Sequence, residues 1–363
     1  MKKNKNYVDL KDQPVPEGQH LLEVDDLKMY FHTEDGVVRA VDGVSYTLDR
    51  GETLGVVGES GSGKSVTAMT IMGLISMPPG KIEGGDVRYR GRSILEMTEE
   101  EMQHIRGNDI AMIFQDPMTS LNPVYKIGKQ VGEGLRLHRG YSKQEALKRA
   151  TELLDLVGIP EPEKRVNEYP HQFSGGMRQR VMIAMALACD PDILIADEPT
   201  TALDVTIQAQ IIELMQEMQE KNGNAIIMIT HDLGVVADMA DKIMVMYAGR
   251  PVEFGTAEEI FYESRHPYTW GLIRSIPEQA IDEKKPLTAI HGNPPSLMNL
   301  PEGCVFSPRC PYATDKCRKQ RPERVVTESG HYSACHYSGD PEFLKNAPET
   351  SRTRKDSKKG GEA

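Results

Sequence analysis

Residues 58–65 read GESGSGKS and fit the phosphate-loop pattern GxxxxGK[ST] at every position. In such a loop, successive backbone N–H groups converge on the β- and γ-phosphates of a nucleotide, and the following helix adds its positive end. We expect Lys64 to neutralise phosphate charge and the Ser65 hydroxyl to bind Mg²⁺. The expected nucleotide-binding residues of this segment are Gly58, Ser60, Gly61, Ser62, Gly63, Lys64, Ser65 and Val66. A glycine-rich turn without a ligand is the alternative, and the strand, loop and helix order counts against it.

Two acidic residues follow another strand-like run, DILIADEP at residues 192–199. Its apolar residues predict a buried strand, so Asp197 should emerge at the carboxyl end beside the phosphates and bind Mg²⁺. Glu198, one residue further, is then placed to polarise the attacking water as a general base. His231 and Gln115 close two more such runs, and we expect contact with the γ-phosphate from His231 and orientation of water or Mg²⁺ by Gln115. A solvated acidic turn and a structural histidine are the alternatives.

A second glycine-containing turn, SGGMRQR at residues 174–180, lies directly before an apolar helical stretch. Ser174, Gly175 and Gly176 would therefore form another helix N-terminus that can bind an anion. One nucleotide cannot readily use this turn and the phosphate loop of the same rigid chain. A head-to-tail pair of domains resolves this, because each SGG turn then faces the nucleotide on the partner's phosphate loop, giving two composite sites.

Apolar runs alternate with helical patterns along much of the chain, which indicates a parallel sheet covered on both faces. The expected buried strands are residues 53–58, 109–114, 192–196 and 225–230. Residues 21–49 alternate between apolar and polar and predict a small antiparallel sheet, and a hairpin is expected at residues 248–250. Residues 116–172 read as helical, with an amphipathic stretch that begins at a Ser142 cap.

We therefore expect an α/β fold with a P-loop NTPase (RecA-like) core. An N-terminal antiparallel β subdomain, an inserted helical subdomain and a small cysteine-containing C-terminal extension complete it. At 363 residues the chain is longer than one average domain. The expected boundaries are an N-terminal tail at 1–20, a nucleotide-binding domain at 21–260, its helical subdomain at about 116–172, the extension at 261–340 and a disordered tail at 341–363.

The composition limits the classes of partner. Lys and Arg total 43 against 54 for Asp and Glu, a net charge of −11, so we expect no nucleic-acid partner. The longest apolar run, residues 181–189, is about half of the roughly 20 residues that a membrane-spanning helix needs. The basic N-terminus has no apolar region after it and does not fit a signal peptide. We expect a soluble chain in the cytosol.

Taken in order, GESGSGKS, Gln115, FSGGMRQR, LIADEP, ALD and His231 resemble the nucleotide-binding subunit of an ATP-binding cassette (ABC) transporter. The resemblance covers about residues 21–255 and implies ATP and Mg²⁺ as ligands. It also implies that Phe31, rather than Tyr30, stacks on adenine.

The same resemblance assigns roles to Asp204 and Gln115 and defines a signature segment around the SGG turn. It implies that Asp204 communicates between the two ATP sites and that the loop of Gln115 senses the membrane partner. The usual signature of the family is LSGGQ, and here Phe173 and Met177 replace the flanking Leu and Gln. The SGG turn keeps its anion site, and the side chain that follows it is that of Met177 instead of Gln.

A narrower resemblance rests on residues 266–277 (HPYTWGLIRSIP) and the cysteine segment that follows them, together with residues 114–123 and 197–211 (DEPTTALDVTIQAQI). These segments are similar to the ATPases of oligopeptide and dipeptide permeases, the D-type subunit in particular. The resemblance implies an importer at the cytoplasmic face of the membrane, with two membrane-spanning permease subunits and an extracellular peptide-binding protein. It also implies a second ATP-binding subunit, a paralogue or a copy. Peptide is the favoured solute, and close relatives carry nickel or sugars.

Four of the five cysteines fall in one segment, at Cys304, Cys310, Cys317 and Cys335. Four thiolates can hold a 4Fe-4S cluster, a tetrahedral zinc ion or form two disulfides, and they can also stay free. None of the gaps is as short as the Cys-x2-4-Cys pairs of structural zinc sites, which disfavours zinc. The permease resemblance implies an iron-sulfur cluster here, and we take that as the expectation.

Two other classes of function compete with a transporter subunit. A soluble ABC-type regulatory ATPase acting on ribosomes or DNA would need no membrane partner, but the chain has no basic face, long coiled-coil insertion or second cassette. A small-molecule kinase would use the phosphate loop and leave SGGMRQR and DEPTTALD unexplained. We therefore expect an ATPase that energises solute import.

Overall fold

The computed structural model describes residues 10–11, 13–116, 120–200, 205–276 and 290–348. Asp204 lies outside the described residues, and so do residues 1–9 and 349–363 of the two expected tails. Within the described ranges, no helix combines the length and the apolar character that crossing a membrane requires.

The centre of the molecule is a mixed sheet. Its described strands follow the order β11–β12–β10–β9–β3–β8–β7–β6, and the stretch from β9 to β6 is parallel. The strand bounds are β3 Thr53–Val57, β6 Ile110–Ile113, β7 Ile193–Asp197, β8 Ala225–Thr230, β9 Lys242–Tyr247, β10 Arg250–Thr256, β11 Val325–Val326 and β12 Tyr332–Ser333. The expected α/β class, the four buried strands and the hairpin between β9 and β10 are confirmed, and each strand bound lies within one residue of its expected position.

Successive residues of these strands enter two different hydrophobic cores. In β7, Ile193 and Ile195 pack into the core that faces the antiparallel sheet, while Leu194 and Ala196 pack into the core beneath the helices. A strand that is buried on both faces needs apolar residues at every position, which explains the unbroken apolar runs of the sequence.

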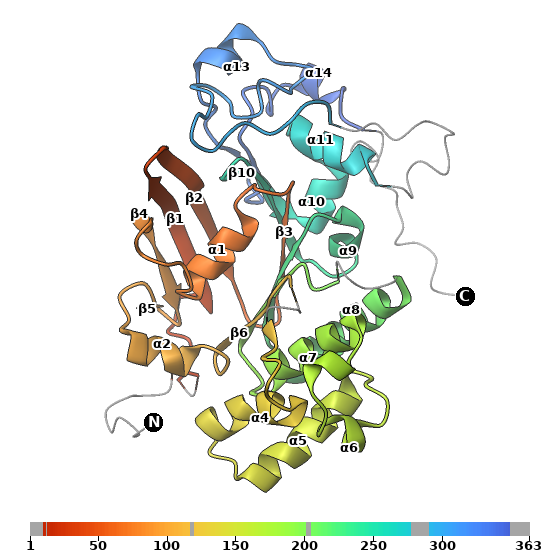
Figure 1. Ribbon diagram of the computed structural model, residues 1–363. Coiled ribbons are helices and arrows are strands. Elements are labelled where there is room, and N and C mark those ends of the chain that lie inside the picture. Colours follow the sequence, from red (N-terminus) through yellow and green to blue (C-terminus); the bar gives the residue numbers. More distant parts are fainter. Residues whose placement is uncertain (1–9, 12, 117–119, 201–204, 277–289, 349–363) are drawn as a thin grey trace, which may run out of the picture.

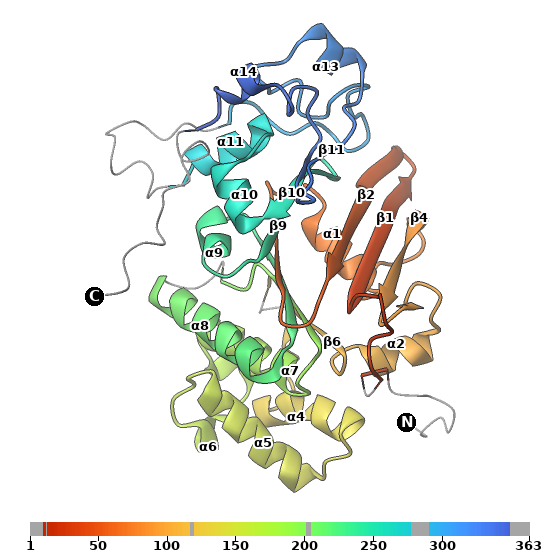
Figure 2. The same cartoon turned by 180° about the vertical axis from the view of Figure 1, so that it is seen from behind.

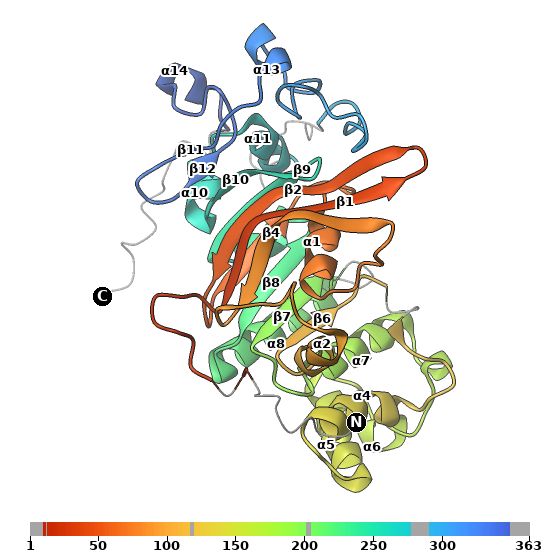
Figure 3. The ribbon, with the colours of Figure 1, turned by 90° about the vertical axis from the view of Figure 1, so that its left-hand side faces the viewer.

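A second, antiparallel sheet stands beside the first, with α1 (Lys64–Ile71) between them (Figures 1 and 3). Its order is β2–β1–β4–β5, and its strands are β1 Leu22–Thr33, β2 Gly36–Leu48, β4 Gly80–Tyr89 and β5 Arg92–Ser93. The sheet expected at residues 21–49 therefore gains β4, which lies beyond α1 in the chain. Gly84 and Gly85 interrupt the apolar alternation of β4, so the period-2 signal of a strand is weak there.

Helices gather at the end of the molecule opposite the cysteine extension (Figures 1 and 2). They are α4 Ile127–His138, α5 Lys143–Leu156, α6 Pro162–Arg165, the 3₁₀ turn η1 Pro170–Gln172, α7 Gly175–Leu187 and α8 Val205–Asn222. Helix α2 Glu99–Ile105 lies below the antiparallel sheet, and α9 Leu233–Ala237 lies nearer the central sheet. As expected, Ser142 caps α5, and it forms a capping box with Glu145. The helical elements α4 to η1 lie inside the range expected for the inserted subdomain.

The C-terminal extension continues the central sheet, because β12 pairs with β10. Its helices are α10 Ala257–Tyr262, α11 Pro267–Arg274, α13 Asp315–Lys319 and α14 Pro341–Leu344. The disordered tail was expected from residue 341, and α14 corrects that boundary. Asp340 caps α14, and the Phe343 ring packs 5.3 Å from Trp270 and 5.5 Å from Tyr312, which gives this short helix a hydrophobic anchor.

Candidate functional site: a composite phosphate and carboxylate edge

The strand order decides where the sequence-predicted residues lie. β3, β8, β7 and β6 are parallel neighbours, so their carboxyl ends meet at one edge of the sheet. The phosphate loop follows β3, His231 follows β8, Asp197 ends β7 and Gln115 follows β6. One edge therefore collects the phosphate-binding segment and the candidate catalytic side chains.

The phosphate loop fits between β3 and neighbouring backbone only because two of its residues lack a side chain. A Cβ on Gly58 would lie 2.2 Å from the Met246 carbonyl oxygen, and one on Gly63 would lie 2.3 Å from that of Ala40. Both glycines also have positive φ, 153° and 101°. Gly63 is the N-cap of α1, so the loop runs directly into the positive end of that helix.

Two polar side chains of the phosphate loop, those of Lys64 and Ser62, are buried. The Lys64 ammonium is buried and donates to the carbonyl oxygens of Gly58 (2.7 Å) and Glu59 (3.0 Å). Burial lowers the pKa of Lys64, and the carboxylates of Glu198, Asp197 and Glu59 oppose that shift. The Ser62 hydroxyl is buried and has no partner among the described residues. A buried cation and an unsatisfied hydroxyl in one loop suit an anionic ligand.

The two expected Mg²⁺ ligands lie together. The Ser65 hydroxyl donates to Oδ1 of Asp197 at 2.9 Å, although 132 residues separate them in the chain. Burial raises the pKa of Asp197, the Ser65 hydrogen bond lowers it, and the nearby charge of Glu198 raises it further. A hydroxyl and a carboxylate are oxygen donors of the kind that Mg²⁺ prefers, so the donor set fits this ion.

Glu198 is the centre of a second cluster at the same edge. Its carboxylate accepts a hydrogen bond from Nε2 of Gln115 at 3.1 Å and lies 3.4 Å from Nδ1 of His231. The residue has a φ of 48°, and its N–H donates to the Ile229 carbonyl of β8 at 2.8 Å. A positive φ is uncommon in a non-glycine residue, and such strained backbone is often found at functional sites. Two predicted catalytic residues, Gln115 and His231, are thus in reach of the third, Glu198.

The expected adenine-stacking residue lies on the antiparallel sheet. Phe31 is half-buried near the end of β1, where it pairs with Val38 of β2. Tyr30, the weaker candidate, donates its hydroxyl to Asp42 at 2.9 Å. That bond holds the Tyr30 ring in place and leaves Phe31 as the better candidate. Val66 is half-buried in α1 and packs on the core beneath it.

The SGG turn occupies a different part of the molecule. Ser174 is the exposed N-cap of α7, and its hydroxyl accepts a hydrogen bond from the Met177 N–H at 3.3 Å. Gly175 and Gly176 open the helix, which packs among α4 and α5 and not beside α1 (Figure 1). Within this chain the structure does not bring the SGG turn to the phosphate loop, which is the arrangement that composite sites between two chains require.

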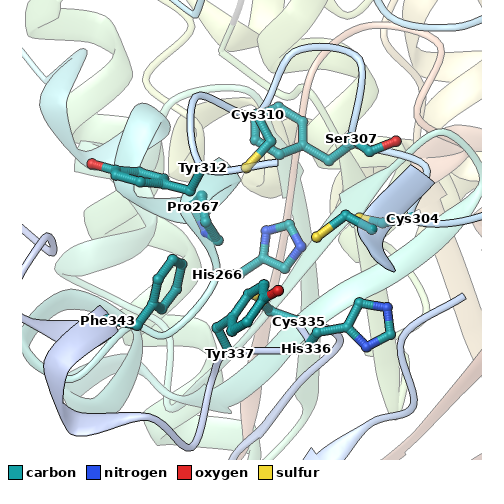
Figure 4. Close-up of a pocket in the computed structure, with 12 residues that line it drawn as sticks. His266, Pro267, Cys304, Ser307, Cys310, Tyr312, Cys335, His336, Tyr337 and Phe343 are labelled. Carbon is teal, nitrogen blue, oxygen red and sulfur yellow. The ribbon is translucent and has the colours of Figure 1, made fainter. Parts of the chain in front are cut away.

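The four clustered cysteines, which are 304, 310, 317 and 335, line one cavity together with aromatic side chains that include Phe306, Tyr312, Tyr337 and Phe343 (Figure 4). All four are free thiols. Burial raises the pKa of Cys304, that of Cys310 to about 11 and that of Cys335 to about 12. In the described residues no group of three or more His, Cys, Asp or Glu side chains is arranged to hold a metal ion, and the cavity volume is about 20 Å³.

Two residues at the phosphate loop were missed by sequence reasoning. Arg309 forms a two-pronged ion pair with the Glu59 carboxylate, and the Tyr268 hydroxyl accepts a hydrogen bond from the Glu59 N–H at 2.9 Å. Tyr268 lies in HPYTWGLIRSIP, so its segment was noticed without a role. Arg309 is 250 residues from Glu59 and carried no local signal.

Family models match two parts of the chain. The model described as ABC transporter matches residues 41–201, and the one described as oligopeptide/dipeptide transporter, C-terminal region, matches residues 252–317. The oligopeptide transport ATP-binding protein OppD of Bacillus subtilis (strain 168) is 58% identical over 86% of this chain and 87% of its own length. The chain belongs to the ABC transporter family. Within that family it falls among the oligopeptide and dipeptide transport ATP-binding proteins.

A second relative and a solved structure support the same family and fold. The dipeptide transport ATP-binding protein DppD of Escherichia coli (strain K12) is 52% identical over 88% of this chain and 97% of its own length. A solved ATP-binding cassette, described as a dimer in a post-hydrolysis state bound to ADP and Pi, superposes with a TM-score of 0.60. It is 29% identical and covers 65% of this chain and 98% of its own. The expected P-loop ABC fold is therefore confirmed.

Proposed function

We propose that this chain binds and hydrolyses ATP as a subunit of an ABC importer that takes up oligopeptides or dipeptides. The observation that carries the hydrolytic part is the convergence of Gln115 and His231 on Glu198, beside the phosphate loop. The peptide class is supported by relatives over 50% identical whose names state oligopeptide or dipeptide transport. A match to the C-terminal region of such transporters supports the same class.

The proposed chemistry divides among named side chains. The loop N–H groups and Lys64 bind the β- and γ-phosphates, and Phe31 stacks on the base. Ser65 and Asp197 hold Mg²⁺, which when bound neutralises phosphate charge. Glu198 accepts a proton from the attacking water, a step that suits a carboxylate held by two neighbours.

His231 and Gln115 then act on the same reaction. His231 contacts the γ-phosphate, while Gln115 orients the water and Mg²⁺ and keeps the Glu198 carboxylate in place. Their common partner is Glu198, so a change in either side chain alters the position of the proposed base. Asp204, which lies outside the described residues, is proposed to communicate between the two ATP sites.

We further propose that two such subunits, paralogues or copies, close head to tail around ATP. Ser174, Gly175 and Gly176 of one chain complete the site on the partner's phosphate loop. Their exposure at the start of α7, and the dimeric cassette that this fold resembles, support this. ATP must bind the closed pair more tightly than the open one, because only differential affinity can drive closure. The closing and opening of the pair is passed to two membrane-spanning subunits through the helices near Gln115. An extracellular binding protein delivers peptide to those subunits.

The solute can be tested directly. In vesicles with the co-expressed membrane subunits and binding protein, we expect a peptide of two to five residues to stimulate ATP hydrolysis several-fold and to accumulate inside. Nickel or a sugar in place of peptide should leave the basal rate unchanged. Stimulation by nickel with none by any peptide would contradict the proposed solute while leaving the ATPase assignment intact.

We also propose that the cysteine cavity holds a 4Fe-4S cluster. Four cysteines from separate parts of the extension converge there, and cysteine thiolates are the ligands of such clusters. In a cluster each thiolate binds a different iron, so the ligands stand further apart than around one ion. The present cavity is about the size of one water, so loading requires the cysteine-bearing loops to move outward.

A prediction about metal content follows. Chain purified without oxygen should be brown and should contain about four irons and four sulfides, because four thiolates complete one such cluster. The measurement is the visible absorption spectrum with iron, sulfide and zinc assays on the same sample. Cys310→Ser should lose the colour, whereas Cys189→Ser, in the core away from the cavity, should keep it. A colourless wild-type chain with one zinc would overturn the cluster.

A further inference from the structure

The phosphate loop of this protein contains a negative charge of its own. Glu59 is the second residue of GESGSGKS, and its side chain is 29% exposed. Its charge acts on the Lys64 ammonium, since the Glu59 carboxylate raises the pKa of that group. A carboxylate in a loop that binds a triphosphate repels the ligand unless a cation neutralises it.

Arg309 supplies that cation from the cysteine extension. Nη1 lies 2.6 Å from Oε2 of Glu59, and Nη2 lies 2.9 Å from Oε1, which is the two-pronged geometry of a strong charge-assisted pair. The Arg309 side chain is 4% exposed, so solvent screens the pair weakly. The hydrogen bonds to Glu59 raise the pKa of Arg309 and keep it charged.

The position of Arg309 is fixed by further contacts. Its guanidinium donates to the carbonyl oxygens of Ile290 (3.1 Å) and His291 (3.0 Å), and to the Tyr247 hydroxyl at 3.2 Å. These three partners lie outside the phosphate loop, so they hold the guanidinium in place independently of Glu59. Because Arg309 is held in place by these other contacts, it can fix the orientation of Glu59.

Glu59 is held by its backbone as well as by its side chain. Its N–H donates to the Tyr268 hydroxyl of α11, and its carbonyl accepts from Lys64. The extension thus contacts the second loop residue at two points, and the lysine proposed to bind phosphate contacts it at a third. These hydrogen bonds and the ion pair connect the extension to the phosphate loop.

We propose that Arg309 is a positioning residue for ATP binding: it neutralises and orients Glu59, so that the phosphate loop presents a net attraction to the nucleotide. This inference rests on the proposed role of that loop. Arg309 directly precedes Cys310 in the extension. The inference therefore implies that the extension contributes to ATP affinity and not to the chemical step.

The test is the ATP dependence of hydrolysis by the assembled transporter. Arg309→Met should raise the KM for ATP about tenfold, the effect of one unpaired carboxylate near the phosphates, and change kcat less than threefold. Arg318→Met is the matched control, because Arg318 lies in the same extension and its exposed side chain pairs with Asp315 three residues away. It should leave both constants unchanged.

The deciding result is rescue. Adding Glu59→Gln to Arg309→Met removes the unpaired charge while keeping the side chain's size, so the KM should return to within threefold of wild type. A purely structural role for Arg309 predicts no such recovery. A KM within twofold of wild type in the single variant, or a raised KM that E59Q fails to lower, would overturn the inference.

A second substitution covers failure of the first to fold. Arg309→Gln removes the charge but keeps a polar amide that donates hydrogen bonds, and the same KM criteria apply to it. If neither variant assembles, even together with E59Q, Arg309 is a structural residue and the inference is wrong. Wild-type transporter that hydrolyses no ATP would instead refute the proposed function, so the two failures are distinguishable.

Discussion

Glu198→Gln is expected to lower ATP turnover by about 10³-fold while ATP binding is retained. The substitution keeps the size and both hydrogen-bonding atoms of the side chain but removes its ability to accept a proton. Gln115 and His231 remain in reach of residue 198, so the geometry around it should survive. The measurements are steady-state hydrolysis and equilibrium binding of ATP to the same preparation.

The variant should also accumulate ATP-bound closed pairs, because binding drives closure and hydrolysis is what reopens the pair. Size-exclusion chromatography with ATP and Mg²⁺ would reveal this. Glu168→Gln is the control, since Glu168 is similarly sheltered (15% exposed against 13% for Glu198) and pairs with Arg165 away from the site. Hydrolysis near the wild-type rate in Glu198→Gln would refute the general-base role.

Ser174→Arg is expected to reduce hydrolysis at the partner's composite site by about 10² to 10³-fold. The long cation would occupy the space in front of the α7 N-terminus, and the anion site of that helix end would be lost. ATP affinity of the isolated chain should stay within twofold of wild type, because its own phosphate loop is untouched. The two readouts are hydrolysis by the assembled pair and nucleotide titration of the single chain.

Ser174→Arg also removes a helix cap, and the resulting loss of stability must be distinguished from loss of the composite site. Ser174 also caps α7, and loss of such a cap costs about 1 kcal/mol of stability. Ser142→Arg removes an equivalent cap from α5 and is expected to lower the melting temperature similarly while hydrolysis persists. If both variants lost activity equally, or if Ser174→Arg weakened ATP binding to its own chain, the composite site would not stand.

Much of the catalytic edge was predictable because its signals are local. A phosphate loop requires a strand before it and a helix after it, and β3 and α1 follow that order. Apolar runs of four to six residues predicted β6, β7 and β8, since parallel strands are buried on both faces. β4 was missed because Gly84 and Gly85 weaken the alternation, and its place beside β1 depends on pairing between strands on either side of α1 in the chain.

The sequence by itself determined the chemistry of this protein. Residue types at fixed spacing specified a phosphate loop, a carboxylate pair and a second anion-binding turn, because each depends on only a few consecutive residues. Only the tertiary structure decided which distant groups meet. The strand order placed Gln115 and His231 on Glu198, and folding of the extension placed Arg309 on Glu59 and four cysteines around one cavity. Such meetings depend on packing between segments up to 250 residues apart, for which no short stretch of sequence carries a signal.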